Sequence, residues 1–252
     1  PFWRALFERL GCEVVLSDKS TKSLVGKGIA ATVPEICLPI KIYMGHVINL
    51  KEKGVDYIFC PRFVHIEKGF WFCPKYIGLP ELVDKTLPDT NLLVAEIDCT
   101  REDTADLKSF MPVAHKLGVS RHAMKEALKG AAEDYAKFRE YCHSGLTLDE
   151  AADVMFKGVS PDKFKREEYM TTIGLLGYVY NVYDPFISME IIDKLRELKV
   201  NVVTFDMLDD YDLVKYRDQR TRPIFWTFAD KLYEAANVMI NDMNVQGLIH
   251  IT

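Results

Sequence analysis

The sequence predicts an α/β fold of two lobes with parallel sheets, bridged by a helical segment. Short apolar runs alternate with amphipathic stretches in the first third, and this alternation restarts after Thr171, while the residues between are mostly helical in pattern. The chain of 252 residues is 48% hydrophobic and 27% charged, which is typical of a folded globular protein and argues against disorder. We expect a first lobe at residues 1–104, a helical bridge at 105–168 and a second lobe at 169–252.

The first lobe is expected to alternate helices and strands. Residues 2–10 read as an amphipathic helix, residues 12–17 as a short buried strand, and residues 38–53 as a helix that follows Cys37 and stops at Gly54. Residues 55–60 and 91–97 read as further strands. Strands separated by helices of this length imply a parallel sheet with right-handed crossovers.

The bridge is expected to be helical because its signals are helix caps and helical spacing. Ser120 can cap a long helix whose apolar residues step by three and four. Thr147 and Glu150 form a capping-box pattern at the start of the next helix. Pro161 and the charged run at 162–168 then mark a boundary before the second lobe.

The second lobe repeats the strand–helix pattern. We expect strands at 172–177 and 200–205, helices at 187–198 and around 225–235, and a last strand that ends at Thr252. That strand lacks the loop that should follow it, and the chain opens on Pro1 without an initiator Met. We therefore expect a piece of a longer protein, with the second lobe truncated at its C-terminal end.

Composition narrows the function classes. The formal net charge is −5 and the basic residues are dispersed, so we expect no nucleic-acid partner. No apolar run approaches the roughly 20 residues that a membrane helix needs, so we expect no membrane partner. The six cysteines are too sparse for a disulfide scaffold, and the absence of an export signal predicts reduced thiols in the cytoplasm.

Cysteines followed by proline are the most unusual local feature. They occur as Cys37-Leu38-Pro39, Cys60-Pro61 and Cys73-Pro74. Proline holds the backbone in a rigid bend and removes an N–H group, and Cys-Pro also closes the ligand run of bacterial ferredoxins. Cys37 precedes a predicted helix, whose dipole favours thiolate, and Cys73 lies in a predicted loop. Local sequence alone still leaves either cysteine open to the alternative of a buried, small apolar residue.

The other cysteines carry weaker signals. Cys60 ends an apolar strand and is expected to pack in the core, whereas Cys12 and Cys142 read as core or surface thiols. The role of Cys99 is open. The paired Cys-x-x-Cys spacing of a structural zinc site is absent from the sequence.

A glycine-ended strand opens into an aromatic loop in the second lobe. Gly177 is followed by three tyrosines, Asn181 and Asp184 before the next helix. This position suits phosphate or nucleotide binding, although the spacing is not that of the dinucleotide fingerprint. The structural alternative is that the tyrosines pack between lobes and Asp184 caps the helix.

Four segments together resemble the acyl-CoA dehydratase activase-related proteins, a group related to the 2-hydroxyacyl-CoA dehydratase subunits. They are CLPIKIYMGH at 37–46, VDYIFCPR at 55–62, FCPKYIGLP at 72–80 and GYVYNVYDP at 177–185. The resemblance implies that the two α/β lobes are Rossmann-like (flavodoxin-like), and that they surround a four-iron four-sulfur cluster held by three cysteines. It also implies an ATP-hydrolysing activase that delivers single electrons to the cluster, and a CoA thioester as the substrate.

Carried over to this sequence, the resemblance makes Cys37 and Cys73 the cluster and metal ligands. The third cysteine is expected beyond Thr252, so we expect no intact cluster in this segment alone. The resemblance also suggests substrate-binding residues, which are Gly45, His46, Asn181, Tyr183 and Asp184. One departure is Tyr178-Val179, which stands where the family often has His-Pro.

The function expected from this resemblance is that of an iron–sulfur protein in ATP-activated low-potential electron transfer, or in radical dehydration or reduction of a CoA thioester. Its expected partner is an ATP-dependent activase-type protein or domain. Two alternatives stay open: a non-catalytic docking module for such an ATPase, and a nucleotide-binding domain that uses the loop at 174–184. Catalytic residues are not predicted.

Overall fold

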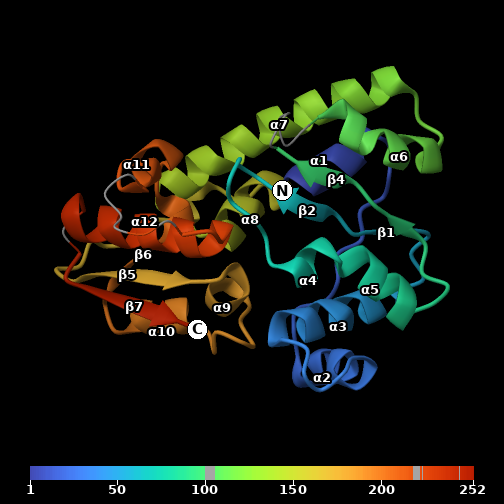
Figure 1. Cartoon of the computed structure of the whole chain (residues 1–252). Helices are drawn as coiled ribbons and strands as arrows, with labels where there is room; N and C mark the ends of the chain where they lie inside the picture. The colour runs from blue at the N-terminus through green and yellow to red at the C-terminus, as the bar shows by residue number, and fades with distance from the viewer. Residues whose placement is uncertain (100–105, 218–221, 223, 244) are drawn as a thin grey trace. The chain divides into compact units, whose positions relative to one another are not determined.

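A computed structural model describes residues 1–99, 106–217, 222, 224–243 and 245–252 (Figure 1). The chain mixes helices with short parallel sheets and is 54% helical, which confirms the predicted α/β class. It divides into two compact units, Phe2–Glu133 and Asp134–Thr252, and Pro1 groups with the latter. The division falls inside helix α7 (Arg121–His143). We call these the first and second units and describe each separately; the predicted boundaries after residues 104 and 168 stay predictions.

The first unit contains two parallel strand pairs among helices. Strand β1 (Ile58–Phe59) pairs with β3 (Leu92–Leu93), and β2 (Arg62–His65) pairs with β4 (Glu96–Asp98). The expected strand at 91–97 is therefore two strands with different partners. The helices before α7 are α1 (Phe2–Arg9), α2 (Lys22–Ala31), α3 (Leu38–Glu52), α4 (Pro74–Ile77), α5 (Leu79–Thr86) and α6 (Leu107–Leu117).

Two apolar clusters form the core of the first unit. One joins α1, α6 and the first half of α7 through residues that include Leu6, Phe110 and Met124. The other joins α3 and α5 to β1 and β3 through residues that include Ile40 and Val83. These helices bury one face each, as their apolar spacing predicts.

The segment at 12–17 is not the strand that the sequence predicts. Cys12 and Val14 pack against the first core cluster, but Leu16 is 62% exposed, so the segment does not alternate between two buried faces. It pairs with no described strand. Polar contacts tie its end to the last turn of α3 and the residue after it. Lys53 Nζ donates to the Leu16 carbonyl oxygen at 2.8 Å, and the Asp18 amide donates to Asn49 Oδ1 at 2.9 Å.

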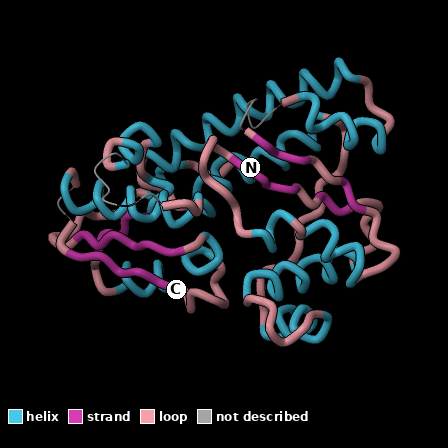
Figure 2. The backbone as a smooth tube through the Cα atoms, viewed as in Figure 1, coloured by secondary structure: helices cyan, strands magenta, loops and turns pink. Residues whose placement is uncertain are grey.

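The second unit holds a three-stranded parallel sheet with the order β6-β5-β7 (Figure 2). Strand β5 (Thr172–Gly177) is central, between β6 (Asn201–Thr204) and β7 (Gly247–Ile251), which confirms the three expected strands. The remaining elements are α8 (Leu148–Lys157), η1 (Pro161–Phe164), α9 (Val179–Tyr183), α10 (Ile191–Glu197), η2 (Phe205–Met207), α11 (Asp210–Val214) and α12 (Thr227–Asn241).

Both faces of this sheet are covered. Leu175 packs with Val182 and Ile192 from the α9 and α10 side, whereas the next residue, Leu176, packs with Met239 of α12. Successive side chains of a strand point to opposite faces, so β5 contributes to both cores. The connection from β5 leads to β6 on one side of it, and the connection from β6 leads back across β5 to β7 on the other side. The carboxyl ends of β5 and β7 therefore lie at the point where the strand order reverses. Open α/β sheets usually bind their ligands at such a point.

Candidate functional site

Cys37 stands at the N-terminal cap of α3. Its backbone is extended (φ −66°, ψ 152°), and Pro39 occupies the first turn of the helix. The Cys37 carbonyl accepts from the Ile40 amide at 3.1 Å, which closes that turn. The side chain is half-buried against the core cluster that contains Ile40. The helix that the sequence predicts after Cys37 is confirmed.

Cys73 repeats this arrangement at the start of α4. It is the N-cap residue, Pro74 follows directly, and its carbonyl accepts from the Tyr76 amide at 2.8 Å. The helix is only four residues long, so its dipole is weaker than that of α3. The Cys73 side chain is exposed.

The two cysteine-led helices border the same core. Cys37 and Tyr76, which lies one turn after Cys73, both pack against the cluster that contains Val83. Across the ranges that the structure describes, no group of three or more histidine, cysteine, aspartate or glutamate side chains is arranged to hold a metal ion. The predicted part of Cys37 and Cys73 in binding a cluster stays a prediction.

The remaining cysteines are less suited to ligation. Cys60 is fully buried, as predicted, and burial raises the pKa of its thiol. Burial, reinforced by the nearby Asp206, raises the pKa of Cys142 to about 11, and burial also raises that of Cys12. A thiol with a raised pKa is a poor source of thiolate. Cys99 donates its backbone amide to the His65 carbonyl oxygen at 3.1 Å and is half-buried.

Gly45 and His46 lie on α3, where both contact neighbouring segments of the first unit. A Cβ atom on Gly45 would lie 2.4 Å from the Leu24 carbonyl oxygen, so glycine permits α2 to approach α3 closely. His46 Nδ1 lies 2.8 Å from Ser17 Oγ, and its Nε2 lies 3.0 Å from Ser20 Oγ. Their predicted part in substrate binding stays a prediction.

The three candidates of the second unit lie in and after α9. Asn181 is buried and donates to the Ile251 carbonyl oxygen at 3.4 Å, which ties the loop after β5 to the end of β7. Asp184 Oδ1 accepts from the amides of Phe186 and Ile187 at 3.0 and 3.1 Å, so it caps the turn before α10. The N-cap residue of α10 is Glu190, so the alternative in which Asp184 caps the helix itself is wrong. The ligand-binding prediction for Asp184 stays a prediction.

Tyr183 belongs to a buried polar network. Its hydroxyl donates to the Asp206 carboxylate at 2.7 Å and lies 2.8 Å from Thr204 Oγ1. Burial raises the pKa of Asp206 despite the hydrogen bond from Tyr183, and burial beside Asp206 raises that of Tyr183. Arg139 donates to the backbone carbonyl oxygens of Asp206 and Leu208 at 2.5 and 3.0 Å. These contacts connect α7, α9 and η2.

An aromatic cluster lies at the carboxyl edge of β5. The rings of Tyr178 and Tyr180 stack with centroids 6.1 Å apart, and Phe228 of α12 lies 5.5 Å from Tyr178. All three residues belong to the second unit. The tyrosines therefore have ring partners within their own unit, beside the β5 end.

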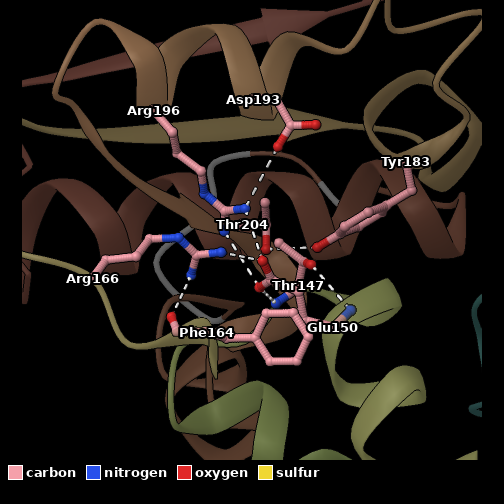
Figure 3. Close-up of polar contacts among 8 residues, drawn as sticks. All are labelled: Thr147, Glu150, Phe164, Arg166, Tyr183, Asp193, Arg196 and Thr204. Carbon is pink, nitrogen blue, oxygen red and sulfur yellow. Dashed lines mark hydrogen bonds and ion pairs between the residues drawn. The ribbon is translucent and has the colours of Figure 1, made fainter. Parts of the chain in front are cut away.

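Two arginines converge on one carboxylate in the second unit (Figure 3). Glu150 accepts from the Thr147 amide at 2.9 Å and completes the predicted capping box. It also pairs with Arg166 Nη2, and with Arg196 Nη1 at 3.0 Å. Burial acts to raise the pKa of Glu150, but the Thr147 amide and the two guanidinium groups outweigh it and lower that pKa.

The sequence indicated the capping box but not the arginine pairs. Arg166 and Arg196 lie 16 and 46 residues from Glu150 along the chain, so local spacing does not connect them. The charged run at 162–168 was a weak signal that marked only a boundary.

Among the residues that the structure describes, no helix has the length and apolar character needed to cross a membrane.

Comparison with known proteins places the chain in a family. A family model described as the CoA enzyme activase uncharacterised domain (DUF2229) matches residues 1–208, a range that includes Cys37, Cys73 and the loop after β5. A search of curated proteins and a search of solved structures found no match. The match covers more than half of the chain and confirms the predicted relationship to activase-related proteins. The chain belongs to the CoA enzyme activase uncharacterised domain family.

Proposed function

We propose that this activase-related chain supplies two cysteine ligands, Cys37 and Cys73, to a four-iron four-sulfur cluster that takes part in ATP-activated low-potential electron transfer. The observation that carries the proposal is the shared design of two helix starts, each with cysteine at the cap and proline in the first turn. Thiolates are the usual ligands of such clusters, which pass on single electrons when bound.

Each cysteine would have a distinct task. Cys37 is half-buried at the start of a 15-residue helix, where its apolar surroundings limit access of water. Cys73 is exposed and so is open to a partner. We propose that a third thiolate comes from outside residues 1–252, that an activase-type ATPase is the partner, and that a CoA thioester is the substrate.

Anaerobic reconstitution with iron and sulfide tests the cluster directly. A polypeptide that includes this chain and continues past Thr252 is expected to bind iron and sulfide and to turn brown. Cys37→Ala and Cys73→Ala should each lower the bound iron, because each removes a ligand that the cluster cannot replace locally. Bound iron and sulfide are measured chemically and by absorbance.

The matched control is Cys12→Ser, since Cys12 packs against the other core cluster of the first unit. This variant should bind as much iron as the natural chain. Unchanged iron content in both Cys37→Ala and Cys73→Ala would refute the assignment. Loss of iron in Cys99→Ser as well would identify Cys99 as a further ligand.

A second candidate is a docking module for an activase-type ATPase that holds no metal. It is favoured by one observation: the described residues do not form a group of three metal ligands. Size-exclusion chromatography of the chain with a purified activase-type ATPase tests it. A colourless complex that also forms with the double variant Cys37→Ala/Cys73→Ala would support docking, whereas a complex that needs both cysteines would contradict it.

A further inference from the structure

A pocket lies beside the arginine pair, entirely within the second unit. It has a volume of about 460 Å³ and is lined by residues 144–146, 161, 164–169, 196 and 200–202. This volume lies in the range of small-molecule sites. Residues 200–202 include the start of β6, so the pocket lies at the amino edge of the sheet, away from the carboxyl edge where β5 and β7 end.

Two arginines of the pocket wall, Arg166 and Arg196, bind the same carboxylate, that of Glu150. Together they carry one positive charge more than Glu150 neutralises. Arg166 and Arg196 both line the pocket, whereas Glu150, to which both bind, is not part of the lining. Side-chain exposure is 11% for Glu150, 16% for Arg196 and 34% for Arg166. Arg196 also lies 3.9 Å from Asp193, but that carboxylate is 73% exposed, so water screens its charge. Two guanidinium groups beside one largely buried carboxylate favour a second anion, because charge is screened less where water is partly excluded.

Both arginines have donors left for such an anion. A guanidinium carries five N–H groups in a fixed fork. Toward the described residues, Arg166 donates to Glu150 and to the Phe164 carbonyl oxygen, and Arg196 contacts Glu150 and, at 3.9 Å, Asp193. These contacts leave N–H groups on each fork, and a carboxylate suits a guanidinium fork geometrically.

The rest of the lining selects the kind of anion. Phe164, Tyr169 and Val200 give the pocket apolar walls, which suit an apolar ligand body. Glu167 and Glu168 also line it, are exposed, and would repel a ligand with several negative charges. Lys165 is paired with Asp162 at 2.6 Å, so its charge is largely compensated.

We propose that this pocket binds a small organic monocarboxylate with an apolar body, held through its carboxylate by Arg166 and Arg196. The site is independent of the two cysteines, which lie in the other unit. It therefore adds a small-molecule ligand to the chain whether or not the cluster assignment holds.

Calorimetric titration of the chain with benzoate tests the site, with inorganic phosphate as the comparison anion. Benzoate is expected to bind, and phosphate to bind more weakly, because phosphate lacks an apolar body and carries more charge. Arg166→Gln should weaken benzoate binding by about tenfold, since it removes one charged donor and leaves Arg196 to neutralise Glu150.

Two further variants keep the test decisive. Ser144→Trp places a large ring at an exposed position of the lining and should block benzoate without changing any charge. Lys157→Gln is the control, because Lys157 pairs with Asp153 on α8 and does not line the pocket. Absence of benzoate binding, tighter binding of phosphate, or equal binding in Arg166→Gln and Ser144→Trp would overturn the proposal. If Arg166→Gln does not fold, Ser144→Trp decides.

Discussion

Two carboxyl groups of the second unit, those of Asp206 and Glu150, have pKa values that folding shifts in opposite directions. The Asp206 carboxylate is buried beneath the Tyr183 hydroxyl, and burial raises its pKa. Glu150 is largely buried too, yet its two arginines and the Thr147 amide lower its pKa. At Asp206 burial outweighs the hydrogen bonds and the nearby Arg139, whereas at Glu150 the Thr147 amide and the two guanidinium groups outweigh burial.

Asp206→Asn is expected to change how stability depends on pH. Because its pKa is raised on folding, the folded state holds the Asp206 proton more tightly than the unfolded state does. This contribution to the free energy of unfolding is fully present below the ordinary Asp pKa of about 4 and is lost as pH rises through the folded pKa. Urea unfolding measured across that pH range should show that the free energy of unfolding falls less with rising pH in Asp206→Asn than in the natural chain.

Glu150→Gln is the opposite case and serves as the comparison. Its lowered pKa contributes stability above the ordinary Glu pKa of about 4.3, and that stability is lost as pH falls through the folded pKa. The natural chain should therefore lose this contribution in acid, and Glu150→Gln should not. If the free energy of unfolding depends on pH in the same way in the natural chain, Asp206→Asn and Glu150→Gln, neither carboxyl group contributes to the pH dependence of stability.

Helices α2 and α3 depend on glycine at their contact. A Cβ atom on Gly28 would lie 1.8 Å from the Lys41 carbonyl oxygen, and one on Gly45 would lie 2.4 Å from that of Leu24. Both obstacles are backbone atoms, which cannot rotate away as a side chain can. The two glycines therefore set the distance between α2 and α3, helices that lie side by side in Figure 1.

Gly45→Ala is expected to destabilise the first unit by about 2 kcal/mol, since the added methyl group overpacks the contact. Gly26→Ala is the matched control, because it lies in α2 with no atom within 4 Å of its Cβ position. Alanine there should stabilise the chain by about 0.5–1 kcal/mol through helix propensity. Chemical denaturation measures both changes, and an equal effect of the two variants would contradict the close approach.

At the scale of the whole chain, each unit has its own apolar core. The two clusters of the first unit end at Ala131, and the clusters of the second unit begin at Phe138. Helix α7 contributes to cores on both sides of the division at Glu133. Separate cores are expected to lose structure separately.

Hydrogen exchange by mass spectrometry tests this independence. Gly45→Ala should speed amide exchange in α2 and α3, because it disturbs the close contact between these two helices. Exchange in β5 and β7 should stay as in the natural chain, since their core lies in the second unit. Faster exchange throughout the chain would show one cooperative unit instead.

Features that depend on neighbouring residues could be predicted from the sequence. Ser120 and Thr147 cap their helices as expected, with the Ala123 amide 3.1 Å from Ser120 Oγ. Cys37 stands at the expected helix start, because proline belongs in a first turn, where its missing N–H costs no hydrogen bond. The loop expected around Cys73 is wrong, since Cys73 is the N-cap of the short helix α4. The family itself was also recognisable from these cysteine segments.

The sequence by itself thus determined the α/β class, several of the helices and the position of Cys37 at a helix start, because caps, prolines and apolar spacing act over a few residues. Only the tertiary structure decided that residues 12–17 form no strand and that 91–97 form two. It also brought Arg166 and Arg196 to Glu150 and made Gly45 a packing residue. The physical reason is that these outcomes depend on contacts between distant segments, whose partners no local pattern specifies.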